Sequence, residues 1–417
     1  MKQIVINGGN TLEGEIKISG AKNSAVALVP ASLLSDGIVK IDNIPDISDI
    51  EALNEILEYL GATVKRDGTL MTIDSKNIVN KEIPESISKK LRASYYFMSA
   101  LLGKYKKVEM YFPGGCSIGA RPIDQTLKTF KALGATVIED GNKYTITAEK
   151  LVGATIHLDM PSVGATINTL LAAVKAEGTT ILKNAAKEPE IVNVATFLNN
   201  MGANIKGAGT SKITIEGVDK LSGCFTEVIP DRIEAGTYLI AGALIGKNLT
   251  IKNIIPEHIE SLTLKLKEMG YKMDIKYDSI TISSQEKLNP IKVKTLGYPG
   301  FPTDLQQPLT TLLTMATGIS ELEETIYENR FQNVEYLNNM GANIKIDNRK
   351  IFIEGPSNLK GTTVKATDLR AGACLVLAAL KAEGTTTITN IEHVLRGYEN
   401  IIEKLLNVGA KIRIEEI

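Results

Sequence analysis

Residues that usually carry redox or metal chemistry are scarce in this sequence of 417 residues. It has three cysteines, three histidines and no tryptophan. Cys116, Cys224 and Cys374 lie far apart without a CxxC pair, and their odd number argues against a disulfide framework and against a zinc site. The histidines are equally scattered and form no HExxH-type pattern. We therefore expect a reduced, cytoplasmic protein that needs no metal or other cofactor.

A strong charge of one sign and long apolar runs are also missing. The formal net charge is −1 and only 5% of the residues are aromatic, whereas a nucleic-acid-binding surface usually needs a basic field and aromatic stacking platforms. No apolar run approaches the length of about 20 residues that a membrane-spanning helix needs. The first ten residues, MKQIVINGGN, read as a strand and not as a signal peptide. Neither nucleic acid nor a membrane is an expected partner, and any anion-binding site must be local.

A short phrase recurs six times along the chain, at spacings of 68 to 73 residues. It reads LGATV, LGATV, MGANI, MGYKM, MGANI and VGAKI, and each copy follows an amphipathic run. A fixed period predicts repeated supersecondary units, and Ser48 with Glu51 fits a capping box at the start of the first amphipathic helix. The glycine of each phrase is expected to end its helix in the left-handed conformation. These glycines are Gly61, Gly134, Gly202, Gly270, Gly341 and Gly409.

A second glycine series follows a more uniformly apolar helix in each repeat. Its members are Gly37, Gly103, Gly178, Gly246, Gly318 and Gly384. A helix that is apolar on most faces is expected to be buried, so each repeat reads as strand, buried helix, strand, outer helix, strand, strand. Because the chain is too long for one ordinary core, we predict an α/β protein of two pseudo-threefold domains with three buried helices in each. A solenoid of the same repeats stays possible, but six such helices favour enclosure.

Charged residues gather where the helices are expected to begin. The starts of the buried helices read GAKNS, KKLRAS, PSVGAT, PDRIEAG, PTDLQQ and TDLRAG. Serine and aspartate are common caps at such positions, whereas the positive end of the helix dipole disfavours lysine and arginine. Cations there indicate a strongly anionic ligand, which we expect in a cleft between the domains. They are Lys22, Arg92, Arg232 and Arg370, joined by Arg121, Arg330 and Arg396 at the expected starts of outer helices.

Cys116 lies in the stretch YFPGGCSIGARPID, residues 111–124. Most lone cysteines are buried and inert, but a thiol is reactive where positive charge lowers its pKa and solvent can reach it. Gly114 and Gly115 favour an exposed turn, and Arg121 follows five residues after the cysteine. The stretch alone leaves two readings open, a buried spectator and a reactive thiol.

Nine motifs distributed over nearly the whole chain carry a specific resemblance. They are SGAKNS (19–24), GGCSIGARPID (114–124), SVGATIN (162–168), KEPEIV (187–192), IPDRIEAGT (229–237), PGFPTDLQ (299–306), YENRF (327–331), TDLRAG (367–372) and RGYE (396–399). With these motifs the chain resembles the UDP-N-acetylglucosamine 1-carboxyvinyltransferases of the enolpyruvyl transferase family. The resemblance implies an inverted α/β barrel fold. One domain would comprise residues 22–229 and the other residues 1–21 with 230–417, with the active site between them.

The resemblance also implies an activity. Members of the family transfer the enolpyruvyl group of phosphoenolpyruvate to the 3-hydroxyl of UDP-N-acetylglucosamine and release phosphate, by addition followed by elimination. This is the first committed step of peptidoglycan precursor synthesis. Cys116 corresponds to the loop cysteine that protonates the phosphoenolpyruvate methylene, can form a covalent adduct and is the target of the epoxide fosfomycin. Asp304 corresponds to the base at the sugar hydroxyl.

The remaining site residues are implied in the same way. Phosphate would be held by Lys22, Arg121 and Arg396, and the carboxylate by Arg330 and Arg370, in keeping with the bidentate grip of arginine on such groups. Asn23 would contact the tetrahedral intermediate. Met160 stands where some relatives have a lysine, so the diphosphate would rest more on Arg121 and backbone amides. The UDP-sugar site would be lined by Arg92, Arg121, Pro122, Ile123, Asp124, Gln125, Ser162, Val163, Asp304 and Ile326.

Two other functions stay open. A 5-enolpyruvylshikimate-3-phosphate synthase would share the fold and the phosphoenolpyruvate chemistry, but it lacks the loop cysteine and the GARPID run. A non-catalytic paralogue that binds the nucleotide sugar as a sensor or scaffold has no evident need for Lys22, Cys116, Asp304, Arg370 and Arg396 together. Phosphate release from phosphoenolpyruvate, measured with UDP-N-acetylglucosamine or with shikimate 3-phosphate as the acceptor, distinguishes these functions. The sequence does not predict the oligomeric state.

Overall fold

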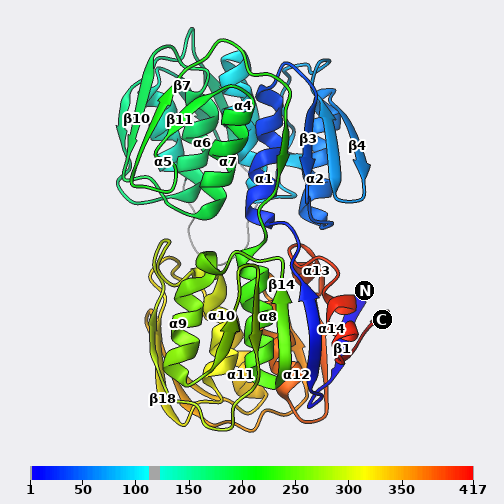
Figure 1. Cartoon of the computed structure of the whole chain (residues 1–417). Coiled ribbons are helices and arrows are strands. Elements are labelled where there is room, and N and C mark those ends of the chain that lie inside the picture. Colours follow the sequence, from blue (N-terminus) through cyan, green and yellow to red (C-terminus); the bar gives the residue numbers. More distant parts are fainter. Residues whose placement is uncertain (1, 112–122, 417) are drawn as a thin grey trace. The chain divides into compact units, whose positions relative to one another are not determined.

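The computed structural model describes residues 2–111 and 123–416. The chain forms two compact units (Figure 1): unit 1 comprises residues 2–19 and 230–416, and unit 2 comprises residues 20–111 and 123–229. The predictions for Cys116, Arg121 and Pro122 fall outside the described residues. Within them, no helix combines the length and the apolar character that crossing a membrane requires.

Unit 2 contains three sheets in its described part, with strand orders β13-β3-β5-β4, β11-β12-β10-β9 and β6-β8-β7. The strands are β3 (Val39–Asp42), β4 (Thr63–Asp67), β5 (Leu70–Asp74), β6 (Lys107–Tyr111), β7 (Thr136–Asp140), β8 (Lys143–Thr147), β9 (Thr155–His157), β10 (Thr179–Lys183), β11 (Asn204–Lys206), β12 (Lys212–Glu216) and β13 (Phe225–Glu227). The helices are α1 (Lys22–Ala31), η1 (Ser32–Leu34), α2 (Ser48–Leu60), α3 (Glu85–Ser88), η2 (Arg92–Tyr95), α4 (Tyr96–Tyr105), α5 (Asp124–Ala132), α6 (Val163–Ala173) and α7 (Pro189–Asn200).

Unit 1 likewise contains three sheets among its described residues, with strand orders β15-β16-β14-β2, β17-β18-β20-β19 and β21-β22-β1-β23. The strands are β1 (Lys2–Asn7), β2 (Leu12–Lys17), β14 (Gly246–Lys252), β15 (Met273–Ile275), β16 (Ser279–Ile282), β17 (Lys292–Lys294), β18 (Gly318–Glu323), β19 (Asn343–Asp347), β20 (Lys350–Gly355), β21 (Thr363–Lys365), β22 (Thr385–Thr389) and β23 (Lys411–Glu416). The helices are α8 (Arg232–Ile245), η3 (Pro256–Ile259), α9 (Glu260–Met269), η4 (Thr303–Leu305), α10 (Gln306–Leu313), α11 (Asn333–Asn339), α12 (Leu369–Lys381), α13 (Glu392–Leu395) and α14 (Ile401–Asn407).

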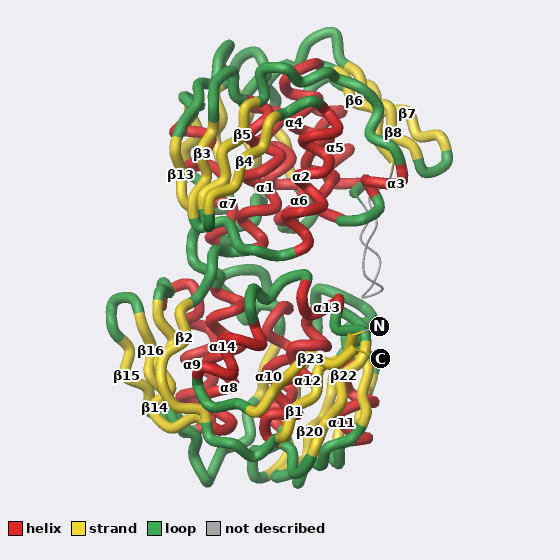
Figure 2. Tube along the Cα trace, turned by 90° about the vertical axis from the view of Figure 1, so that its right-hand side faces the viewer, coloured by secondary structure: helices red, strands yellow, loops and turns green. Residues whose placement is uncertain are grey.

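Each four-stranded sheet combines one parallel pair of strands with two antiparallel pairs. The N-terminal strand β1 lies between β22 and β23, where Ile4 pairs with Ile388 on one side and Ile414 on the other. The first residues of the chain therefore complete a sheet formed by the last ones. In each unit the strands lie outside a group of helices (Figure 2).

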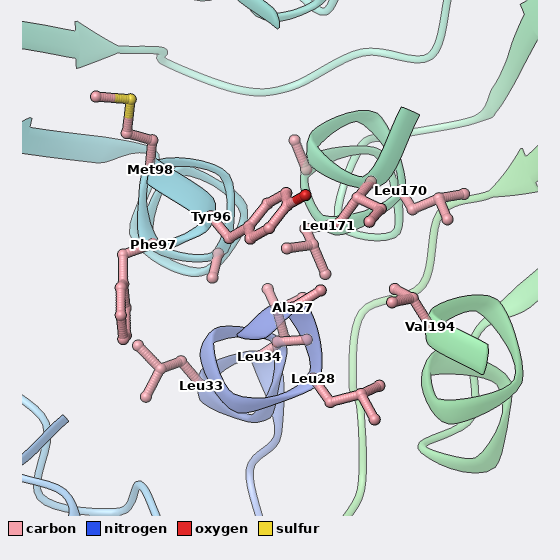
Figure 3. Packing of buried hydrophobic residues seen from close by; sticks show 14 of the residues in the cluster. Ala27, Leu28, Leu33, Leu34, Tyr96, Phe97, Met98, Leu170, Leu171 and Val194 are labelled. Atoms are coloured by element: carbon pink, nitrogen blue, oxygen red, sulfur yellow. The ribbon is translucent and has the colours of Figure 1, made fainter. Parts of the chain in front are cut away.

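The apolar helices form the centre of each unit. All residues of α8 and α10 are buried, and α6 is buried from Ala165 to Ala173, which confirms the burial predicted from their composition. Figure 3 shows side chains of α1, α4, α6 and α7 converging on the space between these helices. In unit 1, α8, α10 and α12 pack against one another. Because their apolar faces meet at the centre, the starts of these helices are held in fixed positions.

The first glycine series has the backbone conformation that the sequence predicts. All six members have φ between 95° and 107°. The capping box is wrong, because α2 begins at Ser48, its N-cap is the extended residue Ile47, and no side chain caps it. The second series is less regular, since Gly103 lies inside α4. Only part of that series, Gly178, Gly318 and Gly384, has positive φ.

Two glycines of the first series allow conformational strain and steric contact to be separated. Alanine in the left-handed conformation costs about 1–2 kcal/mol at either Gly61 or Gly202. A Cβ on Gly61 would also lie 2.7 Å from the carbonyl oxygen of Asn77, whereas a Cβ on Gly202 has no neighbour within 4 Å. We expect both Gly61→Ala and Gly202→Ala to lower the free energy of unfolding, Gly61→Ala by the larger amount. Urea titration measures both in the same unit, and equal losses would contradict the steric contribution.

Candidate active-site residues

Unit 1 brings Asp304, Arg330 and Arg370 into direct contact. Arg330 Nη2 donates a hydrogen bond to Asp304 Oδ1 at 2.8 Å, and Arg370 Nη2 donates one to Asp304 Oδ2 at 3.0 Å. The side chains of Arg330 and Arg370 are only 3% and 4% exposed, whereas that of Asp304 is 25% exposed. A single carboxylate, still partly open to solvent, therefore pairs with two buried guanidinium groups.

Helix starts position this cluster. Asp304 lies in η4, directly before α10, and Arg370 is the second residue of α12. Asp368 caps α12, because its Oδ1 accepts hydrogen bonds from the backbone N–H groups of Arg370 at 2.8 Å and Ala371 at 3.0 Å. Gln307 of α10 donates to the carbonyl oxygen of Arg330 at 3.2 Å. Hydrogen bonds thus connect the start of α10, the start of α12 and the segment before α11.

The charges in this cluster stabilise one another. Burial alone would raise the pKa of Asp304, but Arg370 and Arg330 outweigh burial and hold that pKa well below its usual range. Burial alone would likewise lower the pKa of Arg370, but Tyr398 and Asp304 raise it. All three side chains are consequently charged at neutral pH, and Asp304 in this state is a weak base.

Arg396 lies at the end of a helix, not at the start of one. It is the C-cap of α13, and the next helix, α14, begins at Ile401. The helix-start prediction is therefore wrong for Arg396, and the helix dipole favours a cation where it lies. Two residues later, the ring centroid of Tyr398 is 5.4 Å from Arg370 Cζ. The segment of Arg396 is in this way connected to the arginine cluster.

Lys22 and Asn23 are the first two residues of α1 in unit 2. Lys22 Nζ lies 2.7 Å from Asp49 Oδ2, and the side chain of Asp49 is 3% exposed. An internal carboxylate therefore accompanies the lysine, as Asp304 accompanies Arg330 and Arg370. Cations at helix starts therefore do not by themselves require an external anion here, because internal carboxylates already pair with them.

Most residues predicted for the UDP-sugar lie at helix starts of unit 2. Arg92 begins η2, while Ser162 caps α6 by accepting a hydrogen bond from Ala165 N at 3.2 Å. Gly164 permits a close approach, because a Cβ there would lie 1.8 Å from the hydroxyl oxygen of Tyr95 in η2. Val163 is the first residue of α6. The start of α6 and η2 are thus neighbours.

Gln125 connects the start of α5 to the segment before α6. Its Nε2 donates to Asp159 Oδ2 and its Oε1 accepts from Asp159 N, both at 2.9 Å. Ile123 and Asp124 are the N-cap and the first residue of the same helix. Ile326, by contrast, belongs to unit 1, where the residue is 41% exposed. The UDP-sugar residues predicted from the sequence are therefore divided between the two units.

Several polar side chains around these residues were not predicted from the sequence. Tyr398 stands inside the RGYE motif and Asp49 in the first turn of α2, so both carry a weak signal. Nothing in the sequence distinguishes Gln307 or Glu324, whose contacts depend on the fold. Among the residues the structure describes, no group of three or more histidine, cysteine, aspartate and glutamate side chains is arranged to hold a metal ion.

Comparison with known proteins places the chain in a family. Residues 6–405 match the family model described as EPSP synthase (3-phosphoshikimate 1-carboxyvinyltransferase). The UDP-N-acetylglucosamine 1-carboxyvinyltransferase 2 of Geobacillus kaustophilus is 54% identical over 417 residues, which cover 100% of this chain and 97% of that protein.

Solved structures of enolpyruvyl transferases share the fold. The enolpyruvyl transferase NikO from Streptomyces tendae has a TM-score of 0.90 at 29% identity, over 99% of this chain and 98% of its own. An EPSP synthase from Acinetobacter baumannii has a TM-score of 0.75 over both entire chains, but its 20% identity makes that likeness one of fold alone. From its α/β fold, its family model and its 54% identical relative, we conclude that the chain belongs to the UDP-N-acetylglucosamine 1-carboxyvinyltransferases, within the enolpyruvyl transferase family.

Proposed function

We propose that this chain transfers the enolpyruvyl group of phosphoenolpyruvate to the 3-hydroxyl of UDP-N-acetylglucosamine and releases phosphate, in the first committed step of peptidoglycan precursor synthesis. The observation that carries the proposal is the pair of buried arginines, Arg330 and Arg370, around the partly exposed carboxylate of Asp304. Membership of the family supports the choice of substrates. The reaction would take place in the cytoplasm without a resident metal or cofactor.

Arg330 and Arg370 would hold the carboxylate of phosphoenolpyruvate. Planar guanidinium groups in a buried setting suit a carboxylate, and in this structure both already bind one, that of Asp304. Arg330 Nε is buried and has no hydrogen-bond partner among the described residues, so this arginine has donor capacity left over. We propose that the substrate carboxylate takes over guanidinium donors from Asp304.

Asp304 would act as the general base at the sugar hydroxyl. Its pKa is held low while both arginines bind it, and a substrate carboxylate on those arginines would raise it. In the addition step the hydroxyl oxygen bonds to C2 of phosphoenolpyruvate, its proton passes to Asp304, and Cys116 protonates C3. In the elimination step the Cys116 thiolate takes a proton back from C3, the C2=C3 double bond reforms, and the bond from C2 to the phosphate oxygen breaks as the phosphate leaves with the proton held by Asp304.

The remaining assignments belong to the same proposal. Lys22, Arg121 and Arg396 would bind the phosphate, Asn23 would contact the tetrahedral intermediate, and Arg121 with backbone amides would bind the diphosphate near Met160. Arg92, Arg121, Pro122, Ile123, Asp124, Gln125, Ser162, Val163, Asp304 and Ile326 would line the UDP-sugar site. We propose an inverted α/β barrel with three repeats in each domain. The two domains, residues 22–229 and residues 1–21 with 230–417, would contribute to one active site.

Shikimate 3-phosphate is the alternative acceptor, because the matching family model is described by that activity. Phosphate release from phosphoenolpyruvate, measured with each acceptor in turn, tests the proposal. We expect release with UDP-N-acetylglucosamine and none above background with shikimate 3-phosphate. Release with shikimate 3-phosphate alone would establish the alternative, and release with neither would favour a sensor or scaffold.

Asp304→Asn tests the proposed base. We expect turnover to fall by about 10²–10⁴-fold, the usual loss on removing a general base, while UDP-N-acetylglucosamine still binds by calorimetry. Because the amide leaves two arginines without a carboxylate, a melting curve must show that the variant is folded. Asp347→Asn, at an exposed position at the end of β19, is the matched control. Near-normal turnover of a folded Asp304→Asn variant would remove Asp304 from the mechanism.

Selective alkylation tests the role of Cys116. Burial raises the pKa of both Cys224 and Cys374 to about 11, so at pH 7 only about one in ten thousand of either thiol is ionised. Iodoacetamide and fosfomycin should therefore modify Cys116 alone, and UDP-N-acetylglucosamine should accelerate the reaction with fosfomycin. Cys116→Asp should remain active and resist fosfomycin, since a carboxylic acid still donates a proton. Peptide mass mapping that finds label on another cysteine, or none on Cys116, would contradict the assignment.

A further inference from the structure

Glu324 places a fully buried carboxylate directly after strand β18. Its Oε1 accepts hydrogen bonds from Thr295 Oγ1 at 3.0 Å and from the backbone N–H groups of Ile326 at 2.8 Å and Tyr327 at 3.2 Å. Its Oε2 accepts one from Thr303 Oγ1 at 2.8 Å. One side chain thus binds three separate segments of unit 1 through two hydroxyl groups and two backbone amides.

The hydroxyl of Thr303 extends this arrangement to the arginine cluster. A hydroxyl has a single proton to donate, and that of Thr303 is directed to Glu324. The oxygen is therefore free to accept, and it accepts a hydrogen bond from Arg330 Nη1 at 2.7 Å. The other terminal nitrogen, Arg330 Nη2, binds Asp304. Glu324, Thr303, Arg330 and Asp304 accordingly form one continuous chain of hydrogen bonds.

Anchoring of the loop after β18 does not depend on Glu324 alone. Thr325 N donates to Thr295 Oγ1 at 2.8 Å, and Thr325 Oγ1 donates to the carbonyl oxygen of Thr295 at 2.6 Å. Arg349 Nη1 donates to the carbonyl oxygen of Thr325 at 3.1 Å. Burying a carboxylate is costly unless hydrogen bonds compensate for it. Among these contacts, the distinctive contribution of Glu324 is to fix the hydroxyl of Thr303 and the amides of Ile326 and Tyr327.

We propose that Glu324 is a positioning residue of the active site, which orients Arg330 through Thr303 and holds Ile326 in place without touching substrate. This inference rests on the proposed function, which supplies the substrate groups that Arg330 and Ile326 would bind. Loss of the carboxylate leaves the hydroxyl of Thr303 without a fixed orientation, and Arg330 Nη1 then hydrogen-bonds to an acceptor that is no longer held in place.

Three variants and a matched control test this role. In Glu324→Gln the amide nitrogen faces Thr303 and donates where the carboxylate accepted. Thr303→Val removes the intervening hydroxyl at nearly constant volume, and Thr303→Ser restores it. The control is Glu321→Gln, within strand β18 itself, where the carboxylate forms an ion pair with Lys292 at 2.9 Å. Melting curves report whether each variant is folded at the temperature of the assay.

The first readout is steady-state kinetics at 25 °C. We expect Glu324→Gln and Thr303→Val each to raise the KM for phosphoenolpyruvate about tenfold, as loss of one well-oriented charged hydrogen bond does. Thr303→Ser and Glu321→Gln should stay near the parent value. Since Glu324 acts on Arg330 through Thr303, the double variant Glu324→Gln/Thr303→Val should raise that KM no further than either single change. Full multiplication of the two effects, or a lower melting temperature with unchanged KM, would overturn the inference.

The second readout does not require turnover. Carbon NMR of ¹³C-labelled aspartate follows the titration of Asp304 directly, with Asp304→Asn identifying the signal. Both Glu324→Gln and Thr303→Val should raise the pKa of Asp304, because a misoriented Arg330 stabilises its charge less. Should the parent protein show no enolpyruvyl transfer, the proposed function fails while this titration still decides the positioning role. An unchanged titration in both variants would refute the positioning role.

Discussion

The carboxylate of Asp304, shared between two buried guanidinium groups, is the interaction on which the rest of the site depends. Removing Arg330 and Arg370 from water is unfavourable unless an acceptor accompanies them, and Asp304 binds both. Helix starts reinforce this arrangement, since Asp231 caps α8 and Asp368 caps α12. Because the central helices pack together in the core, the positions of these caps and of Asp304 are fixed by apolar packing. The core therefore determines the geometry of the charged cluster.

This arrangement gives the cluster a chemical property that a lone aspartate lacks. Held by two arginines, Asp304 is ionised and weakly basic. Any second carboxylate that reaches Arg330 and Arg370 raises the pKa of Asp304, because the two anions then share the same hydrogen-bond donors. The proposed reaction brings such a carboxylate on phosphoenolpyruvate, so binding of one substrate would prepare the base that acts on the other. The hydrogen bonds from Glu324 through Thr303 keep Arg330 oriented for this exchange.

Local features could be predicted from the sequence, whereas the partners of charged groups could not. The phrase that contains Gly61 or Gly202 predicted left-handed helix ends because that conformation strongly favours glycine. The uniformly apolar composition of the central helices likewise predicted that these helices are buried. The pairing of Lys22 with Asp49, and the hydrogen bonds of Glu324, depend on which elements the fold brings together. The roles of Asp304 and Arg330 were predicted from the resemblance of motifs and not from the spacing of residues. The position of Arg396 at the end of a helix could not be predicted from the sequence and is seen only in the structure.

A structure with UDP-N-acetylglucosamine and a non-reacting analogue of phosphoenolpyruvate bound would test the central claim most directly. The account predicts that the carboxylate of the analogue lies within hydrogen-bond distance of both Arg330 and Arg370. Asp304 should then have left at least one of these arginines and should face the 3-hydroxyl of the sugar. A complex in which Asp304 still binds both arginines, with the carboxylate of the analogue bound elsewhere, would contradict the account.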